Sequence, residues 1–217
     1  VNFVEMLESK QGDRQAIKQV SCDMSPAFIK GVKENLPEAQ ITFDKFHIIK
    51  LINEAVDQVR REEGKYTPQL KGTRYVFLKN DTNLTAKQKV TKDELSLARL
   101  NLKSVRAMQI RETFQAIYTA ESTEKFESLL NSWYYWATHS QLAPIVKVAK
   151  TIKKHWEGII SWKESQINNG LLEGLNSVLQ AAKRKAKGYK VEHFKTIAYL
   201  LTAKLDFSTA NKNCLPT

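Results

Sequence analysis

The sequence predicts an α/β protein that is mostly helical overall, with a few parallel strands near the start of the chain and a large all-helical region after them. Two observations lead to this fold class. Residues 1–63 alternate helical and strand-like segments, which is typical of parallel strands joined by crossover helices. Most of the remaining chain repeats apolar residues at the spacing of helices. With 217 residues, the chain is long enough to bury a substantial core.

Five elements are expected within residues 1–63. They are a helix over residues 1–9, a strand over residues 16–22, a helix over residues 26–35, a strand over residues 40–43 and a helix over residues 45–63. The last helix has its expected inner face at Phe46, Ile49, Ile52, Val56 and Val59. Two parallel strands make a poor sheet alone, because such sheets are normally buried within a larger set. The chain also opens on Val1 in place of methionine, as a fragment or a processed chain would. We expect a fragment whose other strands lie upstream.

The pattern changes at residue 64. Residues 64–84 are polar and broken by Pro68 and Gly72, so a linker or long loop is expected, with a short ordered run at residues 74–79. Further helices are expected over residues 92–118, 123–138, 144–160, 165–190 and 191–204. The predicted divisions are residues 1–63, residues 64–164 as linker and all-helical insertion, residues 165–205 as the closing helices, and residues 206–217 as a tail.

The charge balance points to a polyanionic partner. The formal net charge is +11 and the pI is about 9.5, whereas the hydrophobic content of 42% is ordinary for a globular protein. A membrane surface would also accept this charge, but no segment approaches the apolar length of a spanning helix. Two cysteines, Cys22 and Cys214, cannot make a disulfide framework, and no ligand spacing suggests zinc. We therefore expect a cytoplasmic protein without membrane partners.

Two acids stand where an α/β sheet normally binds ligands. Asp23 and Asp44 each come directly after a predicted parallel strand, and clustered carboxylates beside a basic surface suit two-metal phosphodiester chemistry. Asp23 is also a reasonable turn residue before Ser25 and Pro26, and Asp44 a reasonable N-cap. His47 would lie beside Asp44 at the first helical turn, either to support a nearby acid or only as a satisfied polar contact.

Residues 165–190 predict an amphipathic helix with one acid, Glu173, near its start. Asn176 and Ser177 occupy the positions three and four residues ahead, where a routine surface glutamate usually finds Lys or Arg. Glu173 is therefore either a residue that compensates the helix dipole or a ligand. The buried stripe of this helix is expected at Leu172, Leu175, Leu179, Ala182 and Ala186.

A basic segment closes the same helix. Its residues are Lys183, Arg184, Lys185, Lys187, Tyr189 and Lys190. Charge runs are usually solvated faces, but this one continues the polar stripe that begins at Glu173 and includes an aromatic residue. We therefore expect it to contact phosphates of a nucleic acid backbone.

A second basic row and a set of tryptophans lie in the helical region. The row is expected on the outer face of the helix over residues 144–160, at Lys147, Lys150 and Lys154. The tryptophans Trp133, Trp136 and Trp156 could stack on an unpaired base, although their helical spacing favours core packing.

Several blocks of the chain resemble bacterial insertion-sequence transposases of the ISL-three group, which are DDE enzymes with a ribonuclease-H-like catalytic fold. The most specific are CDMSPAFIKGVKENLPEAQITFDKFHIIKLINEAVDQVRR (residues 22–61) and INNGLLEGLNSVLQAAKRKAKGY (residues 167–189). LKGTRYVFLKN (residues 70–80) and HWEGIISW (residues 155–162) extend the likeness over most of the chain. The resemblance implies a partial ribonuclease-H-like core, a helical insertion and a catalytic helix, in that order.

The resemblance also implies roles for single residues. Asp23 looks like the second catalytic acid and Glu173 like the third, both as metal ligands, while Asp44 and His47 match a supporting D-x-x-H signature. Such enzymes use two divalent ions, Mg²⁺ or Mn²⁺, to cleave double-stranded DNA at element ends and to join the freed 3′ hydroxyl to target DNA. The implied partners are these DNAs and further copies of the chain, in a homodimer or larger assembly that associates with the nucleoid when bound.

One departure from the family pattern concerns the first catalytic aspartate, which the family carries on an early strand upstream of the first matching block. The zinc-binding and helix-turn-helix regions of the family would also lie upstream. We therefore expect this fragment to be unable to cleave DNA alone. Two other functions remain possible from the residues: a non-catalytic DNA-binding module, such as a decayed transposase remnant, and a helical interaction protein.

Overall fold

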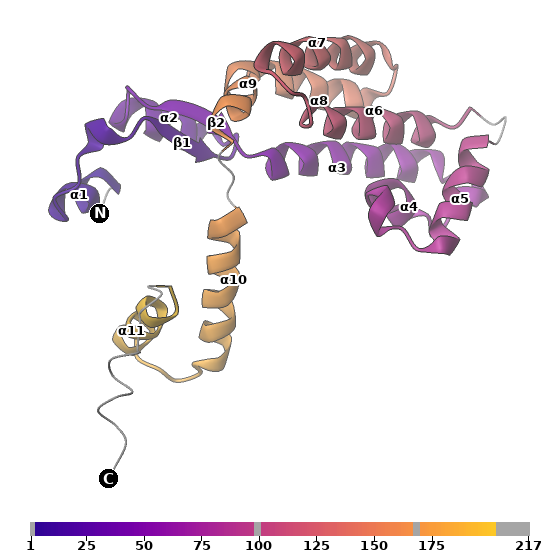
Figure 1. Ribbon diagram of the computed structural model, residues 1–217. Helices are drawn as coiled ribbons and strands as arrows, with labels where there is room; N and C mark the ends of the chain where they lie inside the picture. Colours follow the sequence, from indigo (N-terminus) through magenta and orange to yellow (C-terminus); the bar gives the residue numbers. More distant parts are fainter. Residues whose placement is uncertain (1–2, 98–100, 167–169, 203–217) are drawn as a thin grey trace. The chain divides into compact units, whose positions relative to one another are not determined.

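A computed structural model describes residues 3–97, 101–166 and 170–202, which form two compact units divided between residues 167 and 168 (Figure 1). The first contains α1 (Phe3–Ser9), β1 (Gln19–Cys22), α2 (Pro26–Asn35), β2 (Gln40–Phe43), α3 (Lys45–Glu63), α4 (Arg74–Leu78), α5 (Ala86–Leu97), α6 (Lys103–Ile117), α7 (Thr123–His139), α8 (Ala143–Lys154) and α9 (Trp156–Ser165). The second contains α10 (Gly170–Lys185) and α11 (Val191–Thr202).

The mostly helical α/β class predicted from the sequence is confirmed at this level. β1 and β2 pair in parallel, with Cys22 opposite Phe43, and α2 forms the crossover between them. The first strand begins three residues later than predicted, because residues 14–16 form a 3-10 turn whose N-cap carboxylate, on Asp13, accepts a hydrogen bond from the backbone N–H of Gln15 at 2.8 Å. The ribonuclease-H-like identity of this two-stranded part stays a prediction.

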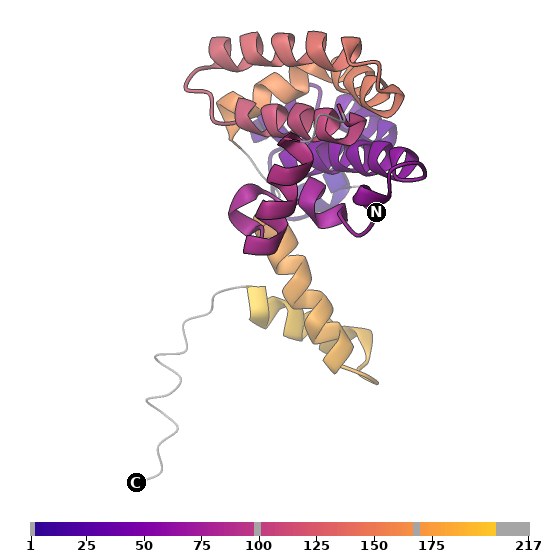
Figure 2. The ribbon, with the colours of Figure 1, turned by 90° about the vertical axis from the view of Figure 1, so that its right-hand side faces the viewer.

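α3 is the helix on which the first unit is built. It packs against α4, α6 and α8, and both views place α6 and α8 between α3 and α7 (Figure 1, Figure 2). Its buried residues are Ile48, Ile52, Ala55, Val56 and Val59. The predicted inner face was wrong at Phe46, whose side chain is 53% exposed. The buried stripe passes instead through Ile48 and Ala55, because α3 is covered on more than one side.

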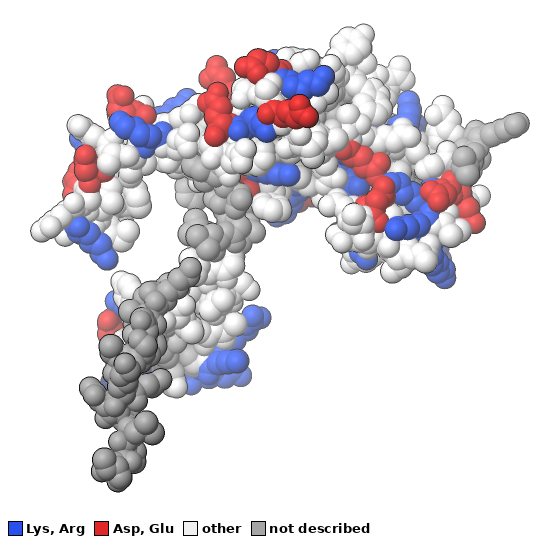
Figure 3. All heavy atoms as spheres, viewed as in Figure 1, with Lys and Arg blue, Asp and Glu red and all other residues white. Residues whose placement is uncertain are grey.

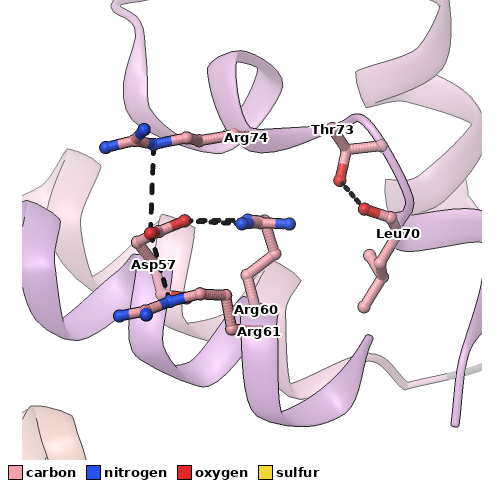
Figure 4. A network of polar contacts seen from close by, with 6 residues as sticks. All are labelled: Asp57, Arg60, Arg61, Leu70, Thr73 and Arg74. Atoms are coloured by element: carbon pink, nitrogen blue, oxygen red, sulfur yellow. Dashed lines mark hydrogen bonds and ion pairs between the residues drawn. The ribbon is translucent and has the colours of Figure 1, made fainter. Parts of the chain in front are cut away.

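Residues 64–84, predicted as a linker or long loop, are folded onto the core. Leu70, Val76 and Phe77 are buried, and the run at residues 74–78 is the helix α4. Thr73 donates its hydroxyl to the carbonyl of Leu70 at 2.6 Å and fixes the turn into α4 (Figure 4). Apolar side chains at isolated positions carry no periodic signal, so the polar composition misled the prediction.

The single helix predicted over residues 92–118 is two helices, α5 and α6. The carboxylate of Glu63, at the end of α3, accepts hydrogen bonds from the backbone N–H groups of Lys103 at 2.8 Å and Ser104 at 2.7 Å. It also accepts the Ser104 hydroxyl at 2.6 Å. These bonds satisfy the free N–H groups of a helix start and favour an acid there, so α6 begins at this point.

The helix predicted over residues 144–160 is also interrupted, at His155, between α8 and α9. α9 then packs against β2 through small residues. The Thr42 hydroxyl lies 2.9 Å from that of Ser161, which also contacts the carbonyl of Ile41 at 3.0 Å. A Cβ on Gly158 would come within 2.4 Å of the ring of Phe43, so only glycine allows this approach. This joint fixes α9 beside β2.

In the second unit, α10 and α11 pack together, and α10 is amphipathic as predicted. Leu175, Leu179, Ala182 and Ala186 of the expected stripe are half-buried. The chain turns after α10 at Gly188, whose φ of 90° is accessible to glycine at low cost. The structure does not describe the side chain of Leu172, the first residue of the expected stripe, nor the predicted tail over residues 206–217.

Candidate functional site

Asp23 and Asp44 lie next to each other at the carboxyl edge of the two-stranded sheet, as predicted. Each directly follows its strand, and the backbone N–H of Asp44 donates to the carbonyl of Cys22 at 3.1 Å. The parallel register therefore places the two acids on neighbouring strand ends. We call this pair the acidic edge.

Asp23 has one carboxylate oxygen engaged and one open. Its Oδ1 accepts a hydrogen bond from the backbone N–H of Ser25 at 2.8 Å, which makes the turn that the sequence suggested. The described residues offer no hydrogen-bond or ion-pair partner to Oδ2. The side chain is half-buried. The open carboxylate oxygen is the kind of ligand atom that hard divalent cations prefer.

Asp44 is fully buried, and both of its oxygens accept hydrogen bonds. Oδ1 accepts from the backbone N–H of Phe46 at 3.0 Å, so Asp44 is the N-cap of α3. Oδ2 lies 3.3 Å from Nδ1 of His47, which is partly exposed. The predicted contact between Asp44 and His47 is thus present, and the cap gives it a structural role in orienting the start of α3.

An aromatic platform that sequence reasoning missed lies beside the acidic edge. The ammonium of Lys45 lies 4.6 Å from the ring centre of Tyr118 and 5.6 Å from that of Trp162. Burial lowers the pKa of Lys45, and burial together with the Asp44 charge raises the pKa of Tyr118. The sequence signal was only the position of Lys45 after Asp44, because Tyr118 and Trp162 are far away along the chain.

The surroundings of Cys22 do not favour a reactive thiol. Burial and the neighbouring Asp23 charge raise the pKa of the Cys22 thiol, which disfavours the reactive thiolate.

Trp133 is buried and donates its ring N–H to the carbonyl of Ile110 at 2.9 Å, so the core interpretation of this residue is confirmed. Trp136 is 39% exposed, and Trp156 is half-buried.

Glu173 belongs to α10 in the second unit, but its side chain lies outside what the structure describes. The structure therefore does not test a metal site shared by Asp23 and Glu173. Within the described residues, no group of three or more His, Cys, Asp and Glu side chains is arranged to hold a metal ion. Asp23 alone of the described acidic edge offers an open oxygen, so a metal there would require further ligands from elsewhere.

The basic segment ends α10 and continues into the turn beyond it. Lys183, Arg184 and Lys185 form the last turn of the helix and are exposed. Lys187, Tyr189 and Lys190 follow, also exposed. Figure 3 shows Lys and Arg side chains gathered at this end of α10. The described residues provide no ion-pair partner to these cations, so their charge is available to an external anion.

Among helices in the described ranges, none is long and apolar enough to cross a membrane.

Comparison with known proteins gives one family. The model of a transposase family, of the DDE type and the ISL3 group, matches residues 1–198. The transposase for insertion sequence element IS1001 of Bordetella parapertussis is 28% identical over 191 residues, covering 84% of this chain and 47% of that protein. The transposase for insertion sequence element IS1557 of Mycobacterium tuberculosis is 25% identical over 203 residues, covering 80% of this chain and 45% of the relative. The chain thus spans about half the length of the curated relatives it matches, and no solved structure matches it.

Proposed function

This chain belongs to the DDE transposase family of the ISL3 group, and we propose that it takes part in metal-dependent cleavage of insertion-sequence ends and in strand transfer to target DNA. Asp23 and Glu173 would be the metal ligands that this chain supplies, and a ribonuclease-H-like core would position them. The observation that carries the proposal is the half-buried Asp23 at a parallel strand end, with one oxygen held by its own turn and the other open.

The surroundings of Asp23 support the same assignment. Asp44 and His47 would hold the start of α3 so that the acidic edge keeps its shape, since Asp44 uses both oxygens within the fold. Bound Mg²⁺ or Mn²⁺ would activate the attacking hydroxyl and neutralise the leaving oxygen. Two acids fall short of the three that the family uses, so we propose that this chain alone does not cleave DNA.

The last helix of the first unit ends beside the strand that leads to Asp44. Ser165, at the end of α9, lies 3.3 Å from Thr42 through their hydroxyls, and Thr42 precedes Asp44 by two residues. Glu173 follows Ser165 by eight residues, and we propose that it completes the metal site with Asp23.

The DNA contact of the proposed reaction would be the basic segment that ends α10. Its six residues carry five cations and one tyrosine, all exposed. Lysine and arginine at such a position neutralise phosphates without reading sequence. We propose double-stranded DNA at element ends and at the target as the partners, bound by a homodimer or larger assembly of the whole protein.

Metal binding tests the assignment of Asp23 and Glu173. We expect Asp23→Asn and Glu173→Gln each to weaken Mn²⁺ binding by about tenfold or more in titration calorimetry, because each removes one carboxylate ligand. Asp93→Asn, an exposed acid on α5, is the matched control. If the unchanged chain binds Mn²⁺ no better than the two variants, the metal-ligand assignment is wrong.

Salt dependence tests the basic segment. Replacing Lys183, Arg184 and Lys185 with Ala should flatten the slope of log affinity against log salt by about 0.9 for each phosphate that the variant no longer neutralises. The measurement is fluorescence anisotropy with a labelled duplex across a salt series. Replacing them with Arg, Lys and Arg, which preserves charge, should keep the slope. An unchanged slope in the alanine variant would leave the segment as a solvated face.

A non-catalytic DNA-binding module is the second candidate function. The exposed basic segment supports it, because contact of lysine and arginine with phosphates requires no metal site. Under this alternative Mn²⁺ binding would be insensitive to Asp23→Asn and Glu173→Gln, whereas DNA binding would still depend on the basic segment.

A further inference from the structure

The outer face of α8 carries a row of lysines that the proposed active site does not use. Lys147, Lys150 and Lys154 are exposed and recur at helical spacing, and α8 contains no acidic residue. The opposite face of the helix is buried through Ile145, Ala149 and Ile152. The row is therefore held on a rigid helix whose apolar side is already used by the core.

The row leads into a groove at the junction of α8 and α9. The groove has a volume of about 630 Å³ and is bounded by α2, the start of β2 and the first turn of α9. Its cationic lining is Lys33 from α2 with Lys153 and Lys154 from α8, and its acidic lining is Glu157. We call the row and this groove together the α8 lysine surface.

The lysines of this surface lack internal counter-charges. No residue in the described ranges forms an ion pair with Lys33, Lys147, Lys150, Lys153 or Lys154. Lys92, in contrast, pairs with Asp81 at 2.6 Å and Glu112 at 2.7 Å in the same unit. Burial and the nearby Lys154 lower the pKa of His155, so this residue adds no further charge near neutral pH. The surface therefore carries five lysines without an ion-pair partner among the described residues, against one acid, Glu157, in the groove.

One lysine of the groove is already positioned by aromatic rings. The ammonium of Lys153 lies 3.8 Å from the ring centre of Trp156 and 5.5 Å from that of Tyr134. Cation–π contacts of this kind restrict a flexible side chain without neutralising it. Trp156 thus serves to hold a charge in the groove, and its ring face is covered by that lysine.

We propose that the α8 lysine surface is a second DNA-binding surface, which contacts the phosphate backbone of double-stranded DNA without reading its sequence. This inference rests on the proposed function and adds to it a site separate from the basic segment of α10. A helix rises by about 1.5 Å per residue, so the backbone positions of Lys147 and Lys154 lie about 10 Å apart along α8, the scale of a few phosphates on one strand.

Double-stranded DNA fits this surface better than a membrane does. A helix that lies on a bilayer must insert an apolar face, and the apolar face of α8 is buried in the core. DNA needs only clustered lysines on a firm support, together with a concave flank that accepts the backbone. Both are present here, with Glu157 as the acid that lines the groove.

The test compares two variants of equal charge change in the full chain. The first replaces Lys147, Lys150, Lys153 and Lys154 with Ala. The control replaces Lys10, Lys65, Lys87 and Lys89 with Ala, which are exposed lysines away from α8. Binding to a labelled duplex of arbitrary sequence is measured across a salt series, and circular dichroism checks folding.

The α8 variant is expected to lower the magnitude of the salt slope by about 2 to 4, at about 0.9 for each phosphate left without its lysine, and to bind more weakly than the control at every salt concentration. A second variant with four arginines at the same positions should keep the slope of the unchanged chain. If the alanine variant misfolds, the pairs Lys147 with Lys150 and Lys153 with Lys154 are replaced separately, and each should lower the slope. A slope equal to that of the control overturns the inference.

Failure of this inference can be distinguished from failure of the proposed function. If the α8 variant behaves like the control while the triple variant of α10 loses binding, DNA is held by α10 alone and only the second surface is disproved. If the unchanged chain binds no duplex even at low salt, both the second surface and the proposed DNA function are wrong.

Discussion

The two ends of α3 carry aspartates in opposite electrostatic surroundings. At the start of the helix, Asp44 caps the backbone, and the neighbouring Asp23 keeps an open oxygen without a cationic partner among the described residues. Near the end, Asp57 is surrounded by three arginines (Figure 4). Arg60 binds its Oδ1 at 2.8 Å, while Arg61 and Arg74 lie 3.3 and 3.9 Å from Oδ2.

The difference separates a structural acid from a ligand candidate. Both arrangements suit the helix dipole, which favours acids at the first turn and cations at the last. At Asp57 the cations come from the protein: Arg60 and Arg61 lie on α3 itself, and Arg74 joins α3 to α4, so both oxygens of the carboxylate are already paired. At the acidic edge, the residues that the structure describes form no ion pair with Asp23, so its second oxygen is open to an external ion.

The largest expected effect is at the start of α3. Asp44→Ala should lower the free energy of unfolding by about 2 kcal/mol, because it removes the N-cap bond and the part-buried contact with His47. Asp44→Asn keeps a capping oxygen and should cost clearly less. Urea unfolding measures both, and equal losses in the two variants would contradict the assigned cap.

A smaller effect is expected at the other end. Asp57→Ala should cost about 1 kcal/mol, since the aspartate and Arg60 are mostly buried but the other two arginines are well exposed and screened by water. Glu54→Ala, an exposed acid of the same helix, is the control and should change stability little. The comparison breaks if Asp57→Ala destabilises the chain more than Asp44→Ala.

The smallest expected effect is the pH dependence of stability that His155 causes beside Phe43, the last residue of β2. His155 packs edge-on against Phe43 with ring centres 5.0 Å apart, and burial with the Lys154 charge lowers its pKa in the folded chain. The unfolded chain then binds more protons below about pH 6.5, so this part of the stability is present at neutral pH and is lost as the pH falls. His155→Gln should therefore weaken the fall in stability between pH 7 and pH 5, measured by thermal unfolding. A steeper fall in the variant would reverse the assigned direction.

Local patterns predicted much of the fold and part of the site. Each aspartate directly follows a predicted strand, and this order predicted the acidic edge. Asp44 stands at an N-cap position with His47 one turn later, and this spacing predicted the contact between the two side chains. Helix breaks were harder, because the apolar spacing continues from α5 into α6 and from α8 into α9. The start of α6 depends on hydrogen bonds to Glu63, about forty residues earlier. The spacing of apolar residues cannot predict a bond between residues so far apart along the chain.

By itself, the sequence determined the parallel strand pair, the amphipathic α10 with its basic segment and the family to which the chain belongs. These features depend on residues close together along the chain, or on whole blocks of sequence. Only the tertiary structure decided that Lys45 rests on Tyr118 and Trp162, that residues 64–84 are part of the core, and that Lys33 joins Lys153 and Lys154 in one groove. These depend on which surfaces meet when helices pack, and packing brings together residues whose separation along the chain leaves no periodic signal.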